Sequence, residues 1–337
     1  MYTRELRDPF SDTSARLAKR YGYRPYMIER YLRLFGVEEA RALLEANERP
    51  QQPFVRVNAL KADAGEVVDA LNARGFGARP VDGVPSALAC DRFRVPSGET
   101  LGSTPEYLRG WYVVQGLASQ LPPLALAPEP GDLVVDACAA PGAKSTQLAA
   151  IALDRCALVA VDRHGGRLRA LRASLSRTGV TNHVVLHADS RRLGEVTGLT
   201  GRVDRVLVDA PCTGEGVIRS DPTRKTSRSM RDVLAMSRVQ SALLGEGLRL
   251  LRPGGRLAYS TCSLAPEEGE FVVDNALRTH PLAGHLRLVP LRFPLGRPAF
   301  TEAFGRELHP GLSNCVRTFP HSDDVEGFFV ALFERNG

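Results

Sequence analysis

The segment DLVVDACAAPGAKS, residues 132–145, joins a short apolar run to a turn of small residues. Its first part, residues 132–137, has the β-branched composition of a buried strand. The stretch KSTQLAAIAL, residues 144–153, follows with helix-forming residues. Small side chains and the Pro141-Gly142 pair between them let the backbone approach a ligand closely. The segment therefore predicts a strand, a tight turn and a helix, although a plain structural turn would explain this pattern equally well.

The alternation of strands and helices continues to the end of the chain. Strands are predicted at residues 156–162, 183–189, 202–210, 254–262 and 327–335, and helices at 165–179, 233–251 and 266–280. Strands separated by helices indicate an α/β fold, with a Rossmann-like parallel sheet covered by helices on both faces. In such sheets ligands bind at the carboxyl ends of the strands.

The N-terminal part has a different pattern. Two or three short helices are predicted within residues 12–48, strands at 53–60, 76–81 and around 91–95, and an amphipathic helix at 64–75. These elements predict helices followed by a small α+β module. Since 337 residues exceed one average domain, we expect two domains, comprising residues 1–115 and 116–337.

The composition favours a soluble protein of the cytoplasm. No run of about 18 apolar residues is present, and the N-terminal stretch MYTRELRDPFSD has no apolar signal core. The six cysteines form no CxxC pair and have no zinc-ligand spacing, so we expect free thiols and no metal.

Basic residues are concentrated in one stretch. The whole chain carries 44 basic and 38 acidic residues, a modest net charge of +6, but residues 217–238 hold six basic and two acidic ones. This stretch is either a solvated helix face or a surface that holds a nucleic acid backbone. Only four of the basic residues are lysine. A lysine at position 144, in the turn after the first strand, is therefore less easily explained as a surface residue without a specific role.

Acidic residues end the next two strands. Asp162 follows VAV and Asp189 follows LHA. A carboxylate at such a position can accept hydrogen bonds from ribose hydroxyls, which favours an adenosine-type ligand. The structural alternative for each aspartate is a helix N-cap.

Two cysteines follow the fourth and fifth strands. Cys212 lies in DAPCTGEG with Asp209, and Cys262 lies in YSTCSLAPEE. A disulfide is the alternative for two close cysteines, but polar strand-end loops and a reducing compartment disfavour it. A thiolate that adds to carbon 6 of cytosine makes carbon 5 nucleophilic towards a sulfonium methyl group. Asp209 could stabilise charge at ring nitrogen 3, Cys212 could assist release, and Lys144 could favour the thiolate.

Together, DACAAPGAKS, DAPCTGEG and YSTCSLAPEE resemble the RNA cytosine-5 methyltransferases of the Nop/Sun type. The resemblance runs from about Phe54 to the end, including RVNALK, GWYVVQGLAS and FPHSDDVEGFFVALFER. It implies a class I methyltransferase sheet in which the two cysteine loops are neighbours. It also implies an N-terminal module, similar to an RNA recognition motif, that contacts RNA. The family usually has glycine and threonine where this chain has Ala143 and Ser145.

The resemblance implies a role for each matching residue. Cys262 would be the nucleophile and Cys212 would promote product release, with Asp209 and Lys144 as further catalytic residues. S-adenosylmethionine would be the cofactor. The residues implied to bind it are Cys138, Ala139, Ala140, Pro141, Gly142, Ala143, Lys144, Asp162, Arg167, Asp189 and Asp209.

Several alternatives stay open at this point. The substrate expected first is tRNA, with rRNA as the second candidate, and the enzyme is expected to be a monomer. DNA cytosine-5 methyltransferases attack with the cysteine of a PC motif, which would make Cys212 the nucleophile. An inactive RNA-binding scaffold would keep the fold without the chemistry. A small-molecule methyltransferase would need neither two cysteines nor the basic stretch.

Overall fold

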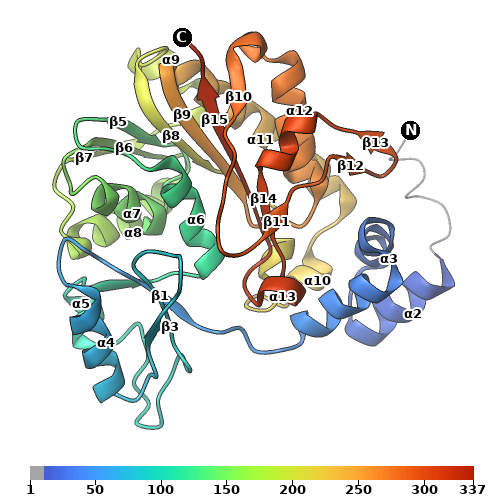
Figure 1. The fold of residues 1–337 in the computed structure, drawn as a ribbon, viewed down its shortest axis with the longest axis horizontal. Coiled ribbons are helices and arrows are strands. Elements are labelled where there is room, and N and C mark those ends of the chain that lie inside the picture. The colour runs from blue at the N-terminus through green and yellow to red at the C-terminus, as the bar shows by residue number, and fades with distance from the viewer. Residues whose placement is uncertain (1–10) are drawn as a thin grey trace.

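Two main sheets organise residues 11–337, which are the part of the chain that the computed structural model describes (Figure 1). A four-stranded sheet lies in the N-terminal part, and a nine-stranded sheet forms the body of the molecule. A small hairpin joins β12 (Glu302–Ala303) to β13 (Arg306–Glu307).

Five parallel strands form the centre of the large sheet. Their spatial order is β7–β6–β5–β8–β9. Their bounds are Leu133–Asp136 for β5, Ala157–Asp162 for β6, His183–His187 for β7, Val203–Asp209 for β8 and Leu251–Thr261 for β9. All five lie where the sequence predicts strands. The order reverses between β5 and β8, and such a reversal opens a crevice at the carboxyl ends of the strands.

The last strand corrects one expectation. β15 (Phe328–Arg335) belongs to the sheet but runs antiparallel to β9, and it also pairs with β14 (Val316–Thr318) and β10 (Leu286–Leu288). Residues 319–327 alone connect β14 to β15, whereas a parallel crossover needs about a dozen or more residues. β11 (Arg297–Pro298) pairs with β14 and completes this mixed edge.

Helices cover both faces of the large sheet, because successive strand residues point to opposite sides. Val134 and Leu207 pack with the side of α6, α7 and α8, whereas Val135 and Val206 pack with the side of α11 and α12. The bounds are Leu117–Leu126 for α6, Ala143–Ile151 for α7, Gly165–Thr178 for α8, Met230–Leu250 for α11 and Glu270–Thr279 for α12. The short helices are α9 (Leu193–Thr197), α10 (Arg224–Ser227) and α13 (Pro320–Asp323). Between residues 11 and 337, no helix has the length and apolar character needed to cross a membrane.

The small sheet confirms the predicted α+β module. Its strand order is β2–β3–β1–β4, and α4 and α5 accompany it. The bounds are Phe54–Val57 for β1, Arg79–Pro80 for β2, Ala87–Ala89 for β3, Tyr112–Val114 for β4, Ala64–Ala73 for α4 and Pro105–Leu108 for α5. The strand predicted around residues 91–95 is wrong, since Arg94 makes only an isolated bridge to Thr100. A tight turn closed by the Gly98 N–H on the Val95 carbonyl leaves no room for a longer ladder.

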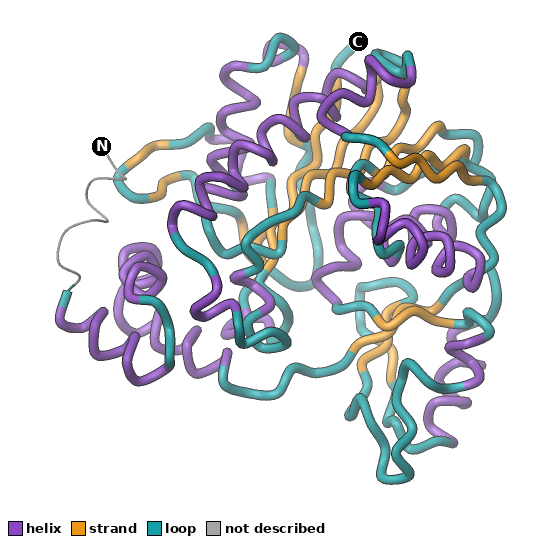
Figure 2. Tube along the Cα trace, turned by 180° about the vertical axis from the view of Figure 1, so that it is seen from behind, coloured by secondary structure: helices purple, strands orange, loops and turns teal. Residues whose placement is uncertain are grey.

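The two N-terminal helices, α2 (Asp12–Tyr21) and α3 (Pro25–Asn47), confirm the predicted helical segment. α3 is kinked at Gly36, whose φ is 75°. Their buried side chains, such as Tyr31, pack against Ile218, Leu264 and Phe319 of the large sheet's loops. Figures 1 and 2 show the four-stranded sheet on the other side of these loops, joined to α3 by one extended segment. The division of the chain into domains at residues 115 and 116 remains a prediction.

Candidate active site

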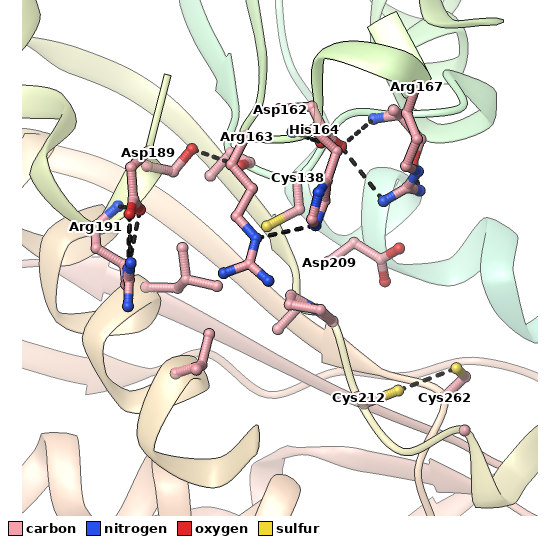
Figure 3. Close-up of a pocket in the computed structure, with 18 of the residues that line it drawn as sticks. Cys138, Asp162, Arg163, His164, Arg167, Asp189, Arg191, Asp209, Cys212 and Cys262 are labelled. Carbon is pink, nitrogen blue, oxygen red and sulfur yellow. Dashed lines mark hydrogen bonds and ion pairs between the residues drawn. The ribbon is translucent and has the colours of Figure 1, made fainter. Parts of the chain in front are cut away.

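A pocket of about 230 Å³ lies at the carboxyl ends of the parallel strands. Eight of the predicted site residues line it, and Figure 3 labels seven of them. They are Cys138, Ala140, Asp162, Arg167, Asp189, Asp209, Cys212 and Cys262. No cluster of three or more potential metal ligands occurs among residues 11–337.

The other predicted cofactor residues lie in the loop between β5 and α7 or in the first turn of α7, and they do not line the pocket. They are Ala139, Pro141, Gly142, Ala143 and Lys144. Gly142 has a φ of 114°, and a Cβ there would lie 2.8 Å from the Cβ of Ser174. The Ser174 hydroxyl donates to the Pro141 carbonyl at 2.7 Å. Glycine is therefore required at this turn both by the backbone conformation and by the close approach of α8.

Asp162 holds this loop in place. Its carboxylate accepts hydrogen bonds from the Ala140 N–H at 3.2 Å and the His164 N–H at 2.8 Å. Arg167 lies 3.5 Å from the carboxylate and also donates to the Ala140 carbonyl. The side chain of Asp162 is only 4% exposed. One carboxylate thus joins the first and second strand ends at the pocket wall.

Asp189 takes both of the roles considered from the sequence. It caps the short 3₁₀ turn Ser190–Arg192, and it also lines the pocket. The Arg191 side chain and, to a lesser degree, the Arg191 N–H donate to the carboxylate and lower its pKa to about 2. Asp189 is therefore an anion throughout the neutral range.

The two cysteine sulfur atoms lie 3.2 Å apart at the other end of the pocket (Figure 3). Both cysteines are free thiols, as expected. The hydrogen bond with Cys262, followed by burial, raises the pKa of Cys212 well above its usual range. Cys212 thus keeps its proton at neutral pH and can donate it to the neighbouring sulfur.

Lys144 pairs with Asp209, and its expected effect on the thiolate remains a prediction. Its Nζ lies 2.7 Å from the Asp209 carboxylate and 2.9 Å from the Ser119 hydroxyl. The Ser260 hydroxyl donates to the other carboxylate oxygen at 2.8 Å. Lys144 lies in the first turn of α7, opposite the end of the adjacent strand β8, and this position places its amine beside Asp209. Figure 3 shows Asp209 between the carboxylates of the pocket and the two sulfur atoms.

Glu268 is a site residue that the sequence analysis missed. Its carboxylate accepts from Thr213 N–H at 3.0 Å, from Gln240 at 3.0 Å and from the Ser263 hydroxyl at 2.5 Å. Burial raises its pKa. It therefore joins the two loops that follow Cys212 and Cys262. The only sequence signal was the glutamate pair after YSTCSLAP, which alone does not indicate burial.

The pocket also has an apolar side that the sequence analysis missed. Val239 and Leu243 of α11 line it opposite the strand ends. Their spacing of four residues puts both side chains on one helix face. An apolar wall beside carboxylates suits a ligand that has a flat ring and hydroxyl groups.

Three of the six basic residues in the stretch at 217–238 form ion pairs within the protein. Arg219 pairs with Asp324 at 2.8 Å and donates to the carbonyl of Pro50. Arg224 pairs with Asp221, and Lys225 pairs with Glu48. Arg231 and Arg238 are exposed on α11 and remain available to a partner. The charge that could contact a nucleic acid is thus smaller than the sequence count indicates.

The strand order and this pocket define a Rossmann-like methyltransferase domain. A family model described as "16S rRNA methyltransferase RsmB/F" matches residues 123–334. The chain belongs to this family. A second model, the ferredoxin-like domain of RsmF/B-like methyltransferases, matches residues 25–95. These matches agree with the family resemblance and the fold class indicated by the sequence.

Similar proteins from three organisms extend the comparison. The human 28S rRNA (cytosine(4447)-C(5))-methyltransferase is 37% identical over 95% of this chain, which spans 38% of that protein. The 25S rRNA (cytosine-C(5))-methyltransferase nop2 of Schizosaccharomyces pombe is 37% identical, with 94% of this chain and 51% of that protein covered. The ribosomal RNA small subunit methyltransferase F of Erwinia tasmaniensis is 33% identical, with 92% and 63% covered. The chain thus spans about half the length of these relatives.

Solved structures share the whole fold. A methyltransferase homolog protein from Pyrococcus horikoshii has a TM-score of 0.84 and 38% identity, with 96% of this chain and 99% of that chain covered. NSun6 from the same organism has a TM-score of 0.80 and 23% identity, with 92% and 97% covered. The second similarity supports the fold alone.

Proposed function

We propose that this protein transfers a methyl group from S-adenosylmethionine to carbon 5 of cytosine in RNA. The observation that carries the proposal is the pair of free thiols 3.2 Å apart in the pocket that Asp162 and Asp189 also line. Named relatives act on carbon 5 of cytosine in rRNA. The family membership supports the same reaction class.

The residues present fit S-adenosylmethionine. The Asp162 and Asp189 carboxylates lie at successive strand ends, where they can accept hydrogen bonds from ribose hydroxyls and from the adenine edge. Val239 and Leu243 can pack against the adenine ring, and the close turn at Gly142 lets the backbone approach the methionine part. When bound, this cofactor supplies an electrophilic methyl group.

Cys262 would act as the nucleophile. Its Sγ forms a bond to carbon 6 of the target cytosine while the thiol proton passes to ring nitrogen 3, and the enamine that results has a nucleophilic carbon 5. Asp209 would accept a hydrogen bond from the protonated ring nitrogen 3, and Lys144, 2.7 Å from Asp209, would balance the charge of this carboxylate. Such chemistry requires the base to leave its stack and enter the pocket.

Cys212 would assist release. After methylation, solvent water accepts the proton on carbon 5 and the double bond between carbons 5 and 6 forms again. The bond between carbon 6 and Cys262 breaks with its electron pair on sulfur, and the proton on ring nitrogen 3 neutralises that sulfur. The Cys212 thiol stays protonated because its pKa is raised, and it lies within hydrogen-bonding distance of the departing sulfur. A hydrogen bond to that sulfur would stabilise the thiolate as it leaves.

We propose rRNA as the substrate on the basis of the names of the relatives. The tRNA preference expected from the sequence finds no support in those names and remains a prediction, as do the cytoplasmic location and the monomeric state. The ferredoxin-like module would contact the RNA outside the pocket. Bisulfite sequencing of total RNA with and without the enzyme would identify the modified RNA and the position.

The test of the proposed function is covalent trapping. RNA that contains 5-azacytosine should form a stable adduct with the wild-type protein in the presence of S-adenosylmethionine, and Cys262→Ala should abolish both the adduct and methyl transfer. Cys90→Ala, in the small module far from the pocket, is the control for loss of a thiol. Full activity of Cys262→Ala would refute the assignment, and absence of any wild-type adduct would favour an inactive scaffold.

A further inference from the structure

A buried arginine of an N-terminal helix is bound to both cysteine loops. The guanidinium of Arg30 in α3 pairs with Glu215 through Nη1 and with Glu267 through Nη2, each at 2.8 Å. The three side chains are at most 3% exposed. Glu215 follows Cys212 by three residues, and Glu267 follows Cys262 by five. The two terminal nitrogen atoms of one rigid guanidinium therefore bind one carboxylate each, and each carboxylate comes from a different cysteine loop.

Residues next to Glu215 and Glu267 also join the two cysteine loops directly. The Gly216 N–H donates to the Cys262 carbonyl at 2.9 Å, so the residue after Glu215 touches the second loop directly. Glu268, next to Glu267, accepts from Thr213 in the first loop and from Ser263 in the second. A displacement of either carboxylate from Arg30 is thus transmitted to a neighbouring residue that contacts the opposite loop.

Arg30 is a counter-ion for both buried glutamates. Without it, Glu215 and Glu267 would be two buried carboxylates near each other, and like charges without a counter-ion disfavour burial strongly. The loops would separate to hydrate them, and the sulfur atoms at their starts would separate as well. A planar guanidinium binds two carboxylates with fixed geometry, whereas a lysine amine acts as a single point charge.

We propose that Arg30 is a positioning residue that sets the distance between the Cys212 and Cys262 sulfur atoms. The consequence for catalysis rests on the function proposed above, but the geometric effect does not. Arg30 lies before Phe54, where the sequence motifs of the resemblance begin, and within residues 25–95, which the ferredoxin-like family model matches. An N-terminal helix would thus complete an active site whose nucleophile and release residue both lie more than 180 positions later in the chain.

The first experiment measures thiol spacing without RNA or cofactor. Phenylarsine oxide binds two nearby thiols, forming two arsenic–sulfur bonds, while the two thiol protons and the arsenic-bound oxygen leave as water. We expect tight binding to the wild type, background binding to Cys262→Ala and at least about tenfold weaker binding to Arg30→Met. Arg74→Met is the matched control, because Arg74 also pairs with two glutamates, Glu99 and Glu106, but in the small module.

Equal arsenical affinities of Arg30→Met and Arg74→Met would overturn the proposal. If Arg30→Met does not fold, Glu267→Gln keeps the side-chain shape, removes one charge and should also weaken arsenical binding. Unchanged binding by a folded Glu267→Gln would then overturn it.

The second experiment connects spacing to turnover. Arg30→Met should lower kcat and leave the KM for S-adenosylmethionine unchanged, and Arg30→Lys should restore only part of kcat. Full recovery of kcat in Arg30→Lys would contradict a role for the planar guanidinium that binds two carboxylates at once. A wild-type protein that binds the arsenical but neither methylates nor traps any RNA would refute the proposed function and leave the positioning role intact.

Discussion

The Sγ atoms of Cys212 and Cys262 lie 3.2 Å apart, although 50 positions separate them in the chain. β8 and β9 are adjacent parallel strands, with Asp209 opposite Ser260, so the loops that follow them begin at the same edge of the sheet. Two thiols in one pocket can divide the work of attack and release between them.

Replacement of Cys212 by alanine should trap a covalent complex with ordinary RNA. Cys262 would still attack and methylation would proceed, but the departing sulfur would lack its hydrogen-bond donor. We expect a band of retarded mobility on a denaturing gel that depends on RNA and cofactor. The Cys212→Ala/Cys262→Ala double variant is the control and should give none. A trapped band with Cys262→Ala alone would mean that Cys212 attacks, as in DNA enzymes.

Lys144→Met should lower kcat by about 10²–10³-fold, because Asp209 loses the cation that balances charge at the base. Ser119→Ala removes the other partner of the lysine and leaves the ion pair with Asp209, so its loss should be smaller. Single-turnover methylation at saturating cofactor separates this effect from cofactor binding. Equal rates for Lys144→Met and Ser119→Ala would contradict the role of the ion pair.

Between pH 5 and pH 9, the protonation state of Asp189 should not change, so it should not alter the affinity for S-adenosylmethionine. The pKa of Asp189 is lowered to about 2, so the carboxylate is charged over this whole range. Asp189→Asn should weaken binding at every pH, as isothermal titration calorimetry would measure. The assignment would be contradicted by a wild-type affinity that falls as one acid is protonated near pH 6, if Asp189→Asn removes this pH dependence.

The lowered pKa of Asp189 also predicts how the stability of the fold depends on pH. A lowered pKa in the folded state stabilises the fold above the unfolded value of 3.8, and this stabilisation is lost as the pH falls towards 2. The Asp189 and Arg191 side chains are 37% and 41% exposed, so solvent screening limits the contribution to at most about 1 kcal/mol. Thermal melts of the wild type and Asp189→Asn should therefore differ little at pH 7.

Two exposed arginines of α11 should account for part of the salt dependence of RNA binding. Arg231 and Arg238 lie seven positions apart, on one side of the helix. Their joint replacement by alanine should reduce the slope of log K against log salt by about 1.4, from two single-strand phosphate contacts. Arg169 and Arg172, exposed on α8, are the matched control. Identical slopes for the two double variants would exclude α11 from the RNA interface.

Gly216→Ala should destabilise the protein by about 1–3 kcal/mol and lower activity. A Cβ there would lie 1.8 Å from the Gly327 carbonyl oxygen and 2.9 Å from that of Cys262, so it would separate the cysteine loops. Gly166→Ala is the control, since nothing lies within 4 Å of its Cβ in α8. That variant should gain about 0.4–1 kcal/mol in urea unfolding. A Gly216→Ala protein as stable and active as the wild type would show that the loops tolerate separation.

Patterns confined to neighbouring residues were sufficient for much of the fold. Apolar strand segments, helix-forming stretches and the turn at Pro141-Gly142 predicted the parallel strands and their covering helices, because burial and turn conformation depend mainly on local residue type. The antiparallel direction of β15 was not predictable in this way. It follows from the short connection to β14 and from a strand pairing that no local pattern specifies.

The sequence by itself determined which residues follow the strand ends, and thus that Asp162, Asp189 and the two cysteines would lie at one edge of the sheet. Only the tertiary structure decided what each of them touches. Lys144 binds Asp209, and Arg30 holds a glutamate from each cysteine loop. Ion pairs between distant segments depend on side-chain direction and burial, which the packed chain sets and which residue order alone does not encode.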